Sequence, residues 1–130
     1  MKTKIFNLFL FLTLTCFSMS SANFIKEYMN FKGTVGTESI RGGLAITESK
    51  TYGTFTYFNS KTNPMYDLRC TSNKSLGNGK YKLNFNVELD GKKYGTWSIT
   101  FNAKTRKITG TMKDENGKTL NINLTEWTLR

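Results

Sequence analysis

The stretch that decides the fold runs from Lys80 to Thr125 and reads KYKLNFNVELDGKKYGTWSITFNAKTRKITGTMKDENGKTLNINLT. Apolar residues occupy alternate positions in four successive segments of it. Such a period of two is typical of β-strands that bury one face. The alternating apolar positions are Tyr81, Leu83, Phe85, Val87, Trp97, Ile99, Phe101, Ile108, Met112, Leu120, Ile122 and Leu124. The stretch therefore predicts four antiparallel strands joined by tight turns.

Two turns in this stretch, Glu88–Lys92 and Asp114–Lys118, share a pattern of an acidic residue, two loop residues, a glycine and a lysine. The pattern favours a three-residue hairpin loop whose glycine adopts the left-handed conformation and forms a G1 bulge. A plain two-residue turn at Asp90-Gly91 would instead turn the apolar residues of one strand to the wrong face. We therefore expect three-residue loops in both hairpins, with a four-residue loop from Ala103 to Arg106 between them.

These turns fix the register of the predicted sheet, because they pair Glu88 with Lys92 and hence Leu83 with Trp97. The inner rows across the sheet would be Leu83–Trp97–Met112–Leu120 and Tyr81–Ile99–Gly110–Ile122. The outer rows would be Lys82–Ser98–Thr111–Asn121, Asn84–Thr96–Lys113–Thr119 and Lys80–Thr100–Thr109–Asn123.

The N-terminal half supplies four further predicted strands, at Phe31–Gly36, Ile40–Glu48, Tyr52–Phe58 and Met65–Thr71. Gly42-Gly43 marks a bulge or a bend in the second of them. Turn residues predict loops at Asn59–Pro64 and Ser72–Gly79. Short strands joined mostly by hairpins predict an all-β, antiparallel up-and-down meander of about eight strands. A closed, calycin-like barrel is preferred over a two-sheet sandwich.

One tripeptide, Gly95-Thr96-Trp97, has the Gly-x-Trp form found in avidins. In those proteins the motif lies in the first strand, whereas here it would lie in the sixth. We therefore assign no family from it.

Residues 1–22 have the composition of a cleaved secretory signal peptide. Lys2 and Lys4 precede a mostly apolar run, and Ser20-Ser21-Ala22 offers small residues for cleavage near Ala22. The apolar run is too short and too interrupted for a membrane span. We expect a secreted or periplasmic chain that is not an integral membrane protein. It would have a short leader at residues 23–30, with the spacing of one helical turn, and a single β-domain at residues 31–130.

The composition argues against catalysis. The chain has no histidine, and Cys70 is the only cysteine beyond the predicted signal peptide. Without histidine, the chain cannot form the Ser-His or Cys-His pairs that activate nucleophiles, or a metal site with imidazole ligands. Four of the nine carboxylates lie in the two hairpin turns, where acidic residues have a structural role. We therefore predict a protein that is not an enzyme and that uses no cofactor and no metal, with Cys70 facing the core.

Cleavage would leave 17 basic and 9 acidic residues, a net charge of +8. This charge favours anionic glycans, envelope polymers or acidic proteins as partners, and nucleic acid is unlikely for an exported chain. The outer face of the Lys80–Thr125 sheet combines lysines with hydroxyl and amide groups and has no acid. The predicted ligand-binding residues on it are Lys80, Lys82, Thr96, Ser98, Thr100, Thr109, Thr111, Lys113, Asn121 and Asn123.

Three functional hypotheses follow. The favoured one is an exported, non-catalytic β-barrel that binds a partner outside the cytoplasm, either an anionic glycan or envelope polymer or a protein. The second is a secreted enzyme inhibitor that probes an acidic cleft with the Asn59–Pro64 loop. The third is a carrier of a small apolar ligand inside the barrel, beside Gly95 and Gly110.

Overall fold

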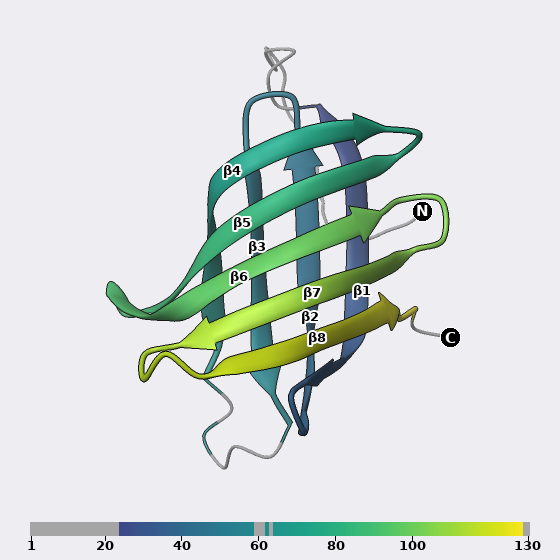
Figure 1. Cartoon of the computed structure of the whole chain (residues 1–130). Coiled ribbons are helices and arrows are strands. Elements are labelled where there is room, and N and C mark those ends of the chain that lie inside the picture. Colours follow the sequence, from purple (N-terminus) through teal and green to yellow (C-terminus); the bar gives the residue numbers. More distant parts are fainter. Residues whose placement is uncertain (1–23, 59–61, 63, 129–130) are drawn as a thin grey trace.

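The computed structural model describes residues 24–58, 62 and 64–128, which form one closed antiparallel barrel (Figure 1). The strands follow one another around the barrel in chain order, and the first pairs with the last to close it. They are β1 (Ile25–Val35), β2 (Glu38–Thr47), β3 (Thr51–Tyr57), β4 (Tyr66–Gly77), β5 (Lys80–Leu89), β6 (Lys92–Asn102), β7 (Lys107–Asp114) and β8 (Thr119–Glu126). The expected all-β, up-and-down closed barrel is confirmed. The predicted signal peptide and most of the Asn59–Pro64 loop lie outside the described residues.

Two segments expected to be irregular are strands. β1 begins at Ile25, so the described part of the leader, with its helical spacing, is instead the first part of a strand that pairs with β2. β4 continues to Gly77, where the sequence predicted a loop from Ser72 to Gly79. This half of β4 is exposed on both faces and pairs only with β5, so no apolar alternation marked it as a strand. Its turn at Asn78-Gly79 has the positive φ angles, 56° and 79°, of a type I′ hairpin.

The β5–β6 hairpin differs from the expected register by two residues. Its turn is the two-residue Asp90-Gly91 turn that the alternation argued against, with φ angles of 52° and 80°. A bulge at Tyr94 follows, because Glu88 pairs with Lys93 but the next pair joins Val87 to Gly95. The extra residue restores the faces that the short turn alone would have reversed. The expected three-residue loop is therefore wrong for this hairpin.

The remaining register predictions are confirmed. Asn102 pairs with Lys107, Trp97 with Met112, and Met112 with Leu120. The Asp114–Lys118 turn has the expected three-residue loop, in which Gly117 has a φ of 83°. The corrected inner rows are Phe85–Trp97–Met112–Leu120, Leu83–Ile99–Gly110–Ile122 and Tyr81–Phe101–Ile108–Leu124.

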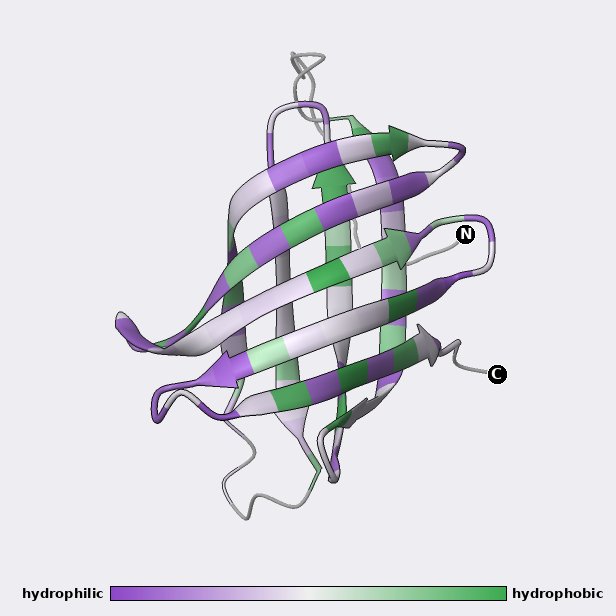
Figure 2. Cartoon of the chain, viewed as in Figure 1, coloured by the Kyte–Doolittle hydropathy of each residue, from purple (hydrophilic) through white to green (hydrophobic). Residues whose placement is uncertain are grey.

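The interior of the barrel is filled by apolar side chains, while polar residues alternate with them along the strands (Figure 2). Trp97 is 1% exposed, and its ring centroid lies 5.0 Å from that of Phe55 and 6.2 Å from that of Phe31. Gly42 faces these rings, and a Cβ atom there would lie 2.7 Å from the Cα atom of Phe55. The register runs through Gly42 and Gly43 without interruption, so the expected bulge is absent there. Gly42 serves close packing instead.

We predict that Trp97→Ala lowers the free energy of unfolding by about 3–5 kcal/mol, because it removes a fully buried ring from the centre of the core. Trp97→Phe should cost clearly less, since it keeps a ring and since Nε1 of Trp97 has no hydrogen-bond partner among the described residues. Urea unfolding followed by circular dichroism measures both. A Trp97→Ala variant as stable as the wild type would contradict this position for the ring.

Candidate functional site

The outer face predicted to bind ligand is assembled by β5–β8, with one change in its rows. The outer rows are Asn86–Thr96–Lys113–Thr119, Asn84–Ser98–Thr111–Asn121, Lys82–Thr100–Thr109–Asn123 and Lys80–Asn102–Lys107–Thr125. The hydroxyl and amide residues of β6–β8 thus lie together as expected. Lys82 lies opposite Thr100 rather than Ser98, although its Nζ atom still donates a hydrogen bond to Ser98 Oγ at 2.9 Å.

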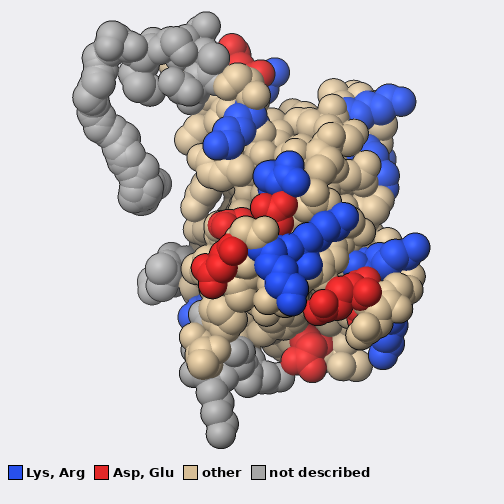
Figure 3. Space-filling view, turned by 90° about the vertical axis from the view of Figure 1, so that its left-hand side faces the viewer, with Lys and Arg blue, Asp and Glu red and all other residues tan. Residues whose placement is uncertain are grey.

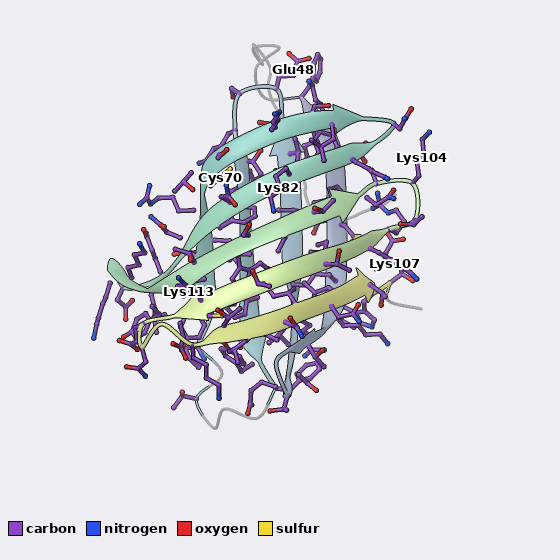
Figure 4. All side chains as sticks on the ribbon, viewed as in Figure 1. Glu48, Cys70, Lys82, Lys104, Lys107 and Lys113 are labelled. Atoms are coloured by element: carbon purple, nitrogen blue, oxygen red, sulfur yellow. The ribbon has the colours of Figure 1, made fainter. Side chains whose placement is uncertain are left out.

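The three lysines of that face do not form one group. Lys80 and Lys82 lie towards the β4–β5 turn, whereas Lys113 lies two rows beyond Lys82, about 13 Å further along the strand direction. Figure 4 shows Lys113 at the opposite end of β7 from Lys104 and Lys107. Beside Lys113, Asp114 and Glu115 begin the β7–β8 turn, and on this side of the barrel acidic and basic side chains are intermixed (Figure 3).

The structure adds three lysines to the other end of the face, and we call the resulting group the lysine end. It consists of Lys74, Lys80, Lys82, Lys104 and Lys107. Lys74 lies directly opposite Lys82 on β4, and Lys107 shares a row with Lys80. The side chain of Lys104 lies against the β4–β5 turn. A Cβ atom built on Gly79 in that turn would be 3.2 Å from the Cγ atom of Lys104. Sequence reasoning missed these three lysines because their segments were assigned as loops or lie outside the predicted rows.

The charges of the lysine end have no carboxylate partners in the described part of the chain. All three ion pairs found there are made by arginines: Arg69 with Glu88 at 2.8 Å, and Arg106 with Glu27 at 3.5 Å and with Glu126 at 3.1 Å. Like charges directly opposite each other on neighbouring strands, such as Lys74 and Lys82, disfavour the folded state slightly. An anion bound between them would relieve this repulsion.

A second surface, which the sequence did not predict, is a groove along the outside of β2. Its outward rows are Tyr28–Ala45–Tyr52, Asn30–Gly43–Thr54 and Lys32–Arg41–Thr56. Small residues of β2 form its floor, and longer side chains of β1 and β3 form its walls. The β2 groove has a volume of about 490 Å³, and Met65 and Trp127 also line it.

Arg41 lies at one end of the β2 groove, and its guanidinium packs against two aromatic rings. Its Cζ atom lies 4.7 Å from the ring centroid of Phe58 and 5.1 Å from that of Trp127. Backbone hydrogen bonds position the main chain of both residues, from Phe58 N–H to the Ser39 oxygen at 3.0 Å and from Trp127 N–H to the Asn30 oxygen at 2.9 Å. No carboxylate of the described residues pairs with Arg41. The guanidinium is therefore oriented by stacking while its N–H groups remain available.

Two tyrosines close the other end. Ala45 lies between Tyr28 and Tyr52 and is only 3% exposed although it faces outward, so the tyrosine side chains cover it. Burial raises the pKa of Tyr28, the neighbouring Tyr52 raises it further, and a hydrogen bond to Asn30 opposes the shift. The Tyr28 hydroxyl thus stays protonated at neutral pH and donates to Asn30 Oδ1 at 2.9 Å. Lys50 adds a positive charge 5.3 Å from the Tyr52 ring centroid.

The described residues contain no group of three histidine, cysteine or acidic residues that could hold a metal ion. Asp67 and Arg69, which share a face of β4, do not pair with each other, because Arg69 pairs with Glu88 across the β4–β5 hairpin. No helix in the described part of the chain is long and apolar enough to cross a membrane.

The chain matches no protein-family model, no curated protein and no solved structure at a significant level.

Cys70 packs against the core, as the alternation predicted, but remains partly exposed. Its Sγ atom lies 3.4 Å from the backbone oxygen of Ser72, to which the thiol donates. Burial raises the pKa of the Cys70 thiol, and the hydrogen bond to Ser72 opposes the shift. A raised pKa means that less of the reactive thiolate is present at neutral pH.

We predict that iodoacetamide modifies Cys70 of the folded protein more slowly than it modifies free cysteine at pH 7. The rate should keep rising with pH beyond about 8.5, the usual pKa of a thiol, because the pKa is shifted upward. Mass spectrometry of timed samples measures the rate, and the protein unfolded in urea provides the control, which should react like free cysteine. A folded protein that reacts faster than free cysteine at pH 7 would contradict the prediction.

Proposed function

We propose that this chain is an exported, non-catalytic β-barrel that binds an anionic polymer outside the cytoplasm, such as a sulfated or uronate-rich glycan or an anionic envelope polymer. The observation that carries the proposal is the lysine end, where five lysines come together from β4, β5, β7 and the β6–β7 loop. None of them has a carboxylate partner among the residues that the structure describes. Export is supported by the composition of residues 1–22.

A linear polymer fits the shape of this surface. The row Lys82–Thr100–Thr109–Asn123 crosses β5–β8 and continues from the lysine end as a line of hydroxyl and amide groups. Neighbouring strands are about 4.8 Å apart, so the row offers a polar contact at that interval over about 14 Å. Anionic groups would be attracted by the lysines, and hydroxyl groups of a glycan would exchange hydrogen bonds with threonine and asparagine.

Two other functions have less support. The inhibitor hypothesis depends on the Asn59–Pro64 loop, most of which lies outside the described residues. The carrier hypothesis depends on space beside Gly95 and Gly110 in the interior. A Cβ atom on Gly110 would lie 2.7 Å from the Cα atom of Ile99, and one on Gly95 would lie 3.1 Å from Cε of Met112. These glycines thus mark crowded contacts between strands.

We predict that replacing three lysines of the lysine end, Lys80, Lys82 and Lys107, with glutamine weakens heparin binding at least about tenfold, or about 1.4 kcal/mol. Wild-type binding should itself weaken as salt rises, because exposed charges are screened beyond about 8 Å at physiological ionic strength. Heparin affinity chromatography and titration at two salt concentrations measure both effects.

The matched control replaces Lys92, Lys93 and Lys118, near the acidic hairpin turns, with glutamine. It removes the same charge from the other end of the barrel and should bind nearly as well as the wild type. Lys113→Gln alone should also change binding little, because Lys113 lies at that end. Equal loss in both triple variants would mean that net charge alone attracts heparin. Unchanged binding in the first variant would exclude the lysine end as the site.

A further inference from the structure

We propose that the β2 groove is a second binding site, specific for a single sugar ring that carries a carboxylate, as a uronic acid does. The groove lies over β1–β3, at the back of the barrel in Figure 1, whereas the lysine end belongs to the strands in front. The inference therefore rests on different residues from the proposed function, and either can fail alone.

Arg41 is the group that recognises the carboxylate. A guanidinium offers paired N–H donors in a fixed plane that matches the two oxygens of a carboxylate. Stacking between Phe58 and Trp127 fixes this plane before a ligand arrives, so less side-chain entropy is lost on binding. Arginines that serve the fold of this protein are ion-paired, as Arg69 and Arg106 are, and Arg41 is the exception among the described arginines.

The floor and walls of the groove suit a ring with an apolar face and a polar rim. Trp127, Tyr28 and Tyr52 offer aromatic surface, and Gly43 leaves the space between them open. A Cβ atom on Gly43 would lie 3.3 Å from Asn30 Oδ1 and 3.9 Å from the Tyr28 hydroxyl, so a larger side chain there would fill the site. Gly43 faces outward and has no packing role like that of its neighbour Gly42.

Polar groups along the groove provide partners for sugar hydroxyls. Asn30 uses its Oδ1 atom to accept from Tyr28, which leaves its Nδ2 atom as a donor. Thr54 follows Gly43 in the same row. Thr56 also lines the groove, although its Oγ1 atom is buried and has no hydrogen-bond partner among the described residues.

The charges around the groove select an acidic sugar over a neutral or purely apolar ligand. Arg41 and Lys50 place positive charge at the two ends of the groove. Asp67 follows Thr54 in its row but does not line the groove. A neutral sugar would leave Arg41 unpaired, and an apolar ligand would leave the amide and hydroxyl groups without partners.

The test is titration of the ¹⁵N-labelled protein with sodium glucuronate, glucose and acetate, followed by NMR at physiological salt. We expect saturable shifts for glucuronate at the amides of Gly43 and Thr54 and at the indole N–H of Trp127. Glucose and acetate should each bind at least about tenfold more weakly, because each lacks half of the recognised groups. Benzoate, a flat carboxylate without hydroxyls, should also bind more weakly than glucuronate.

Three variants locate the site. Arg41→Gln should weaken glucuronate binding at least about tenfold and leave the weak binding of glucose unchanged. Arg41→Lys keeps the charge but loses the planar pair of donors, and it should also weaken binding. Lys32→Gln is the matched control, since it removes the same charge from the same row without touching the groove, and should bind like the wild type. The NMR spectrum of each variant reports whether it is folded.

The inference would be overturned if glucuronate gave no saturable shift. It would also be overturned if benzoate or acetate bound as tightly as glucuronate, or if Arg41→Gln and Lys32→Gln lost binding equally. The variant with Lys80, Lys82 and Lys107 replaced by glutamine should bind glucuronate like the wild type. Loss of glucuronate binding in that variant would assign the ligand to the lysine end instead, and would likewise overturn the inference.

Discussion

The pairing of β1 with β8 is the constraint on which the rest of the structure depends. It joins Phe31–Val35 to Ile122–Glu126 and turns a meander into a closed cylinder. Closure gives every inward side chain neighbours on all sides, and the core around Trp97 fills the space so enclosed. A filled interior leaves the outer surface as the place for recognition, and both surfaces described above lie there.

Closure is incomplete at two places, and each has its own protection. The first residues of β1 extend beyond the end of β8, and there Arg106 donates to the Tyr28 oxygen at 2.6 Å and Trp127 N–H donates to the Asn30 oxygen. The second half of β4 has no backbone pairing with β3 among the described residues, although the Asn73 side chain donates a hydrogen bond to Thr51 Oγ1 at 2.8 Å. It carries Lys74 and polar residues, which is how sheet edges commonly avoid pairing with other chains. Two residues at these edges also belong to candidate sites, Lys74 to the lysine end and Trp127 to the β2 groove.

The parts of this fold that the sequence predicts are those set by local rules. Apolar alternation identifies β5–β8, and the Asp114–Lys118 turn sets its own register through Gly117. The predicted β5–β6 register was wrong because the preferred turn type and the apolar alternation conflict there. The Asp90-Gly91 turn and the alternation disagree by one residue, and the bulge at Tyr94 that reconciles them has no clear sequence signal. The second half of β4 was missed because a strand exposed on both faces has no alternation to detect.

The candidate sites also contain some features that local sequence rules predict and others that they do not. Threonine, asparagine and lysine on one outer face could be identified from period two alone, because every second position on a strand points to the same face. The lysine end needed the true extent of β4, which brings Lys74 opposite Lys82. The β2 groove depends on contacts between segments far apart in the chain, since Arg41 of β2 lies between Phe58 after β3 and Trp127 after β8. The signal for it in the sequence was small residues at Gly43 and Ala45 on the outer face of a strand, which becomes meaningful only when the neighbouring strands and their tyrosines are known.

The positive charges of the lysine end and of the β2 groove differ in number and in how firmly they are held. In the lysine end, Lys82 is half-buried and the other four lysines are exposed. Exposed charge of this kind would give rapid association and salt dependence more than selectivity. A single arginine between two rings, beside a floor of small residues, would instead distinguish ligands by shape and by hydrogen bonds. Because they lie on different sides of a closed barrel, one short ligand does not reach both. A long acidic glycan would reach both only by passing around the barrel, and binding at one site would then raise the effective concentration of the polymer at the other without any new contact.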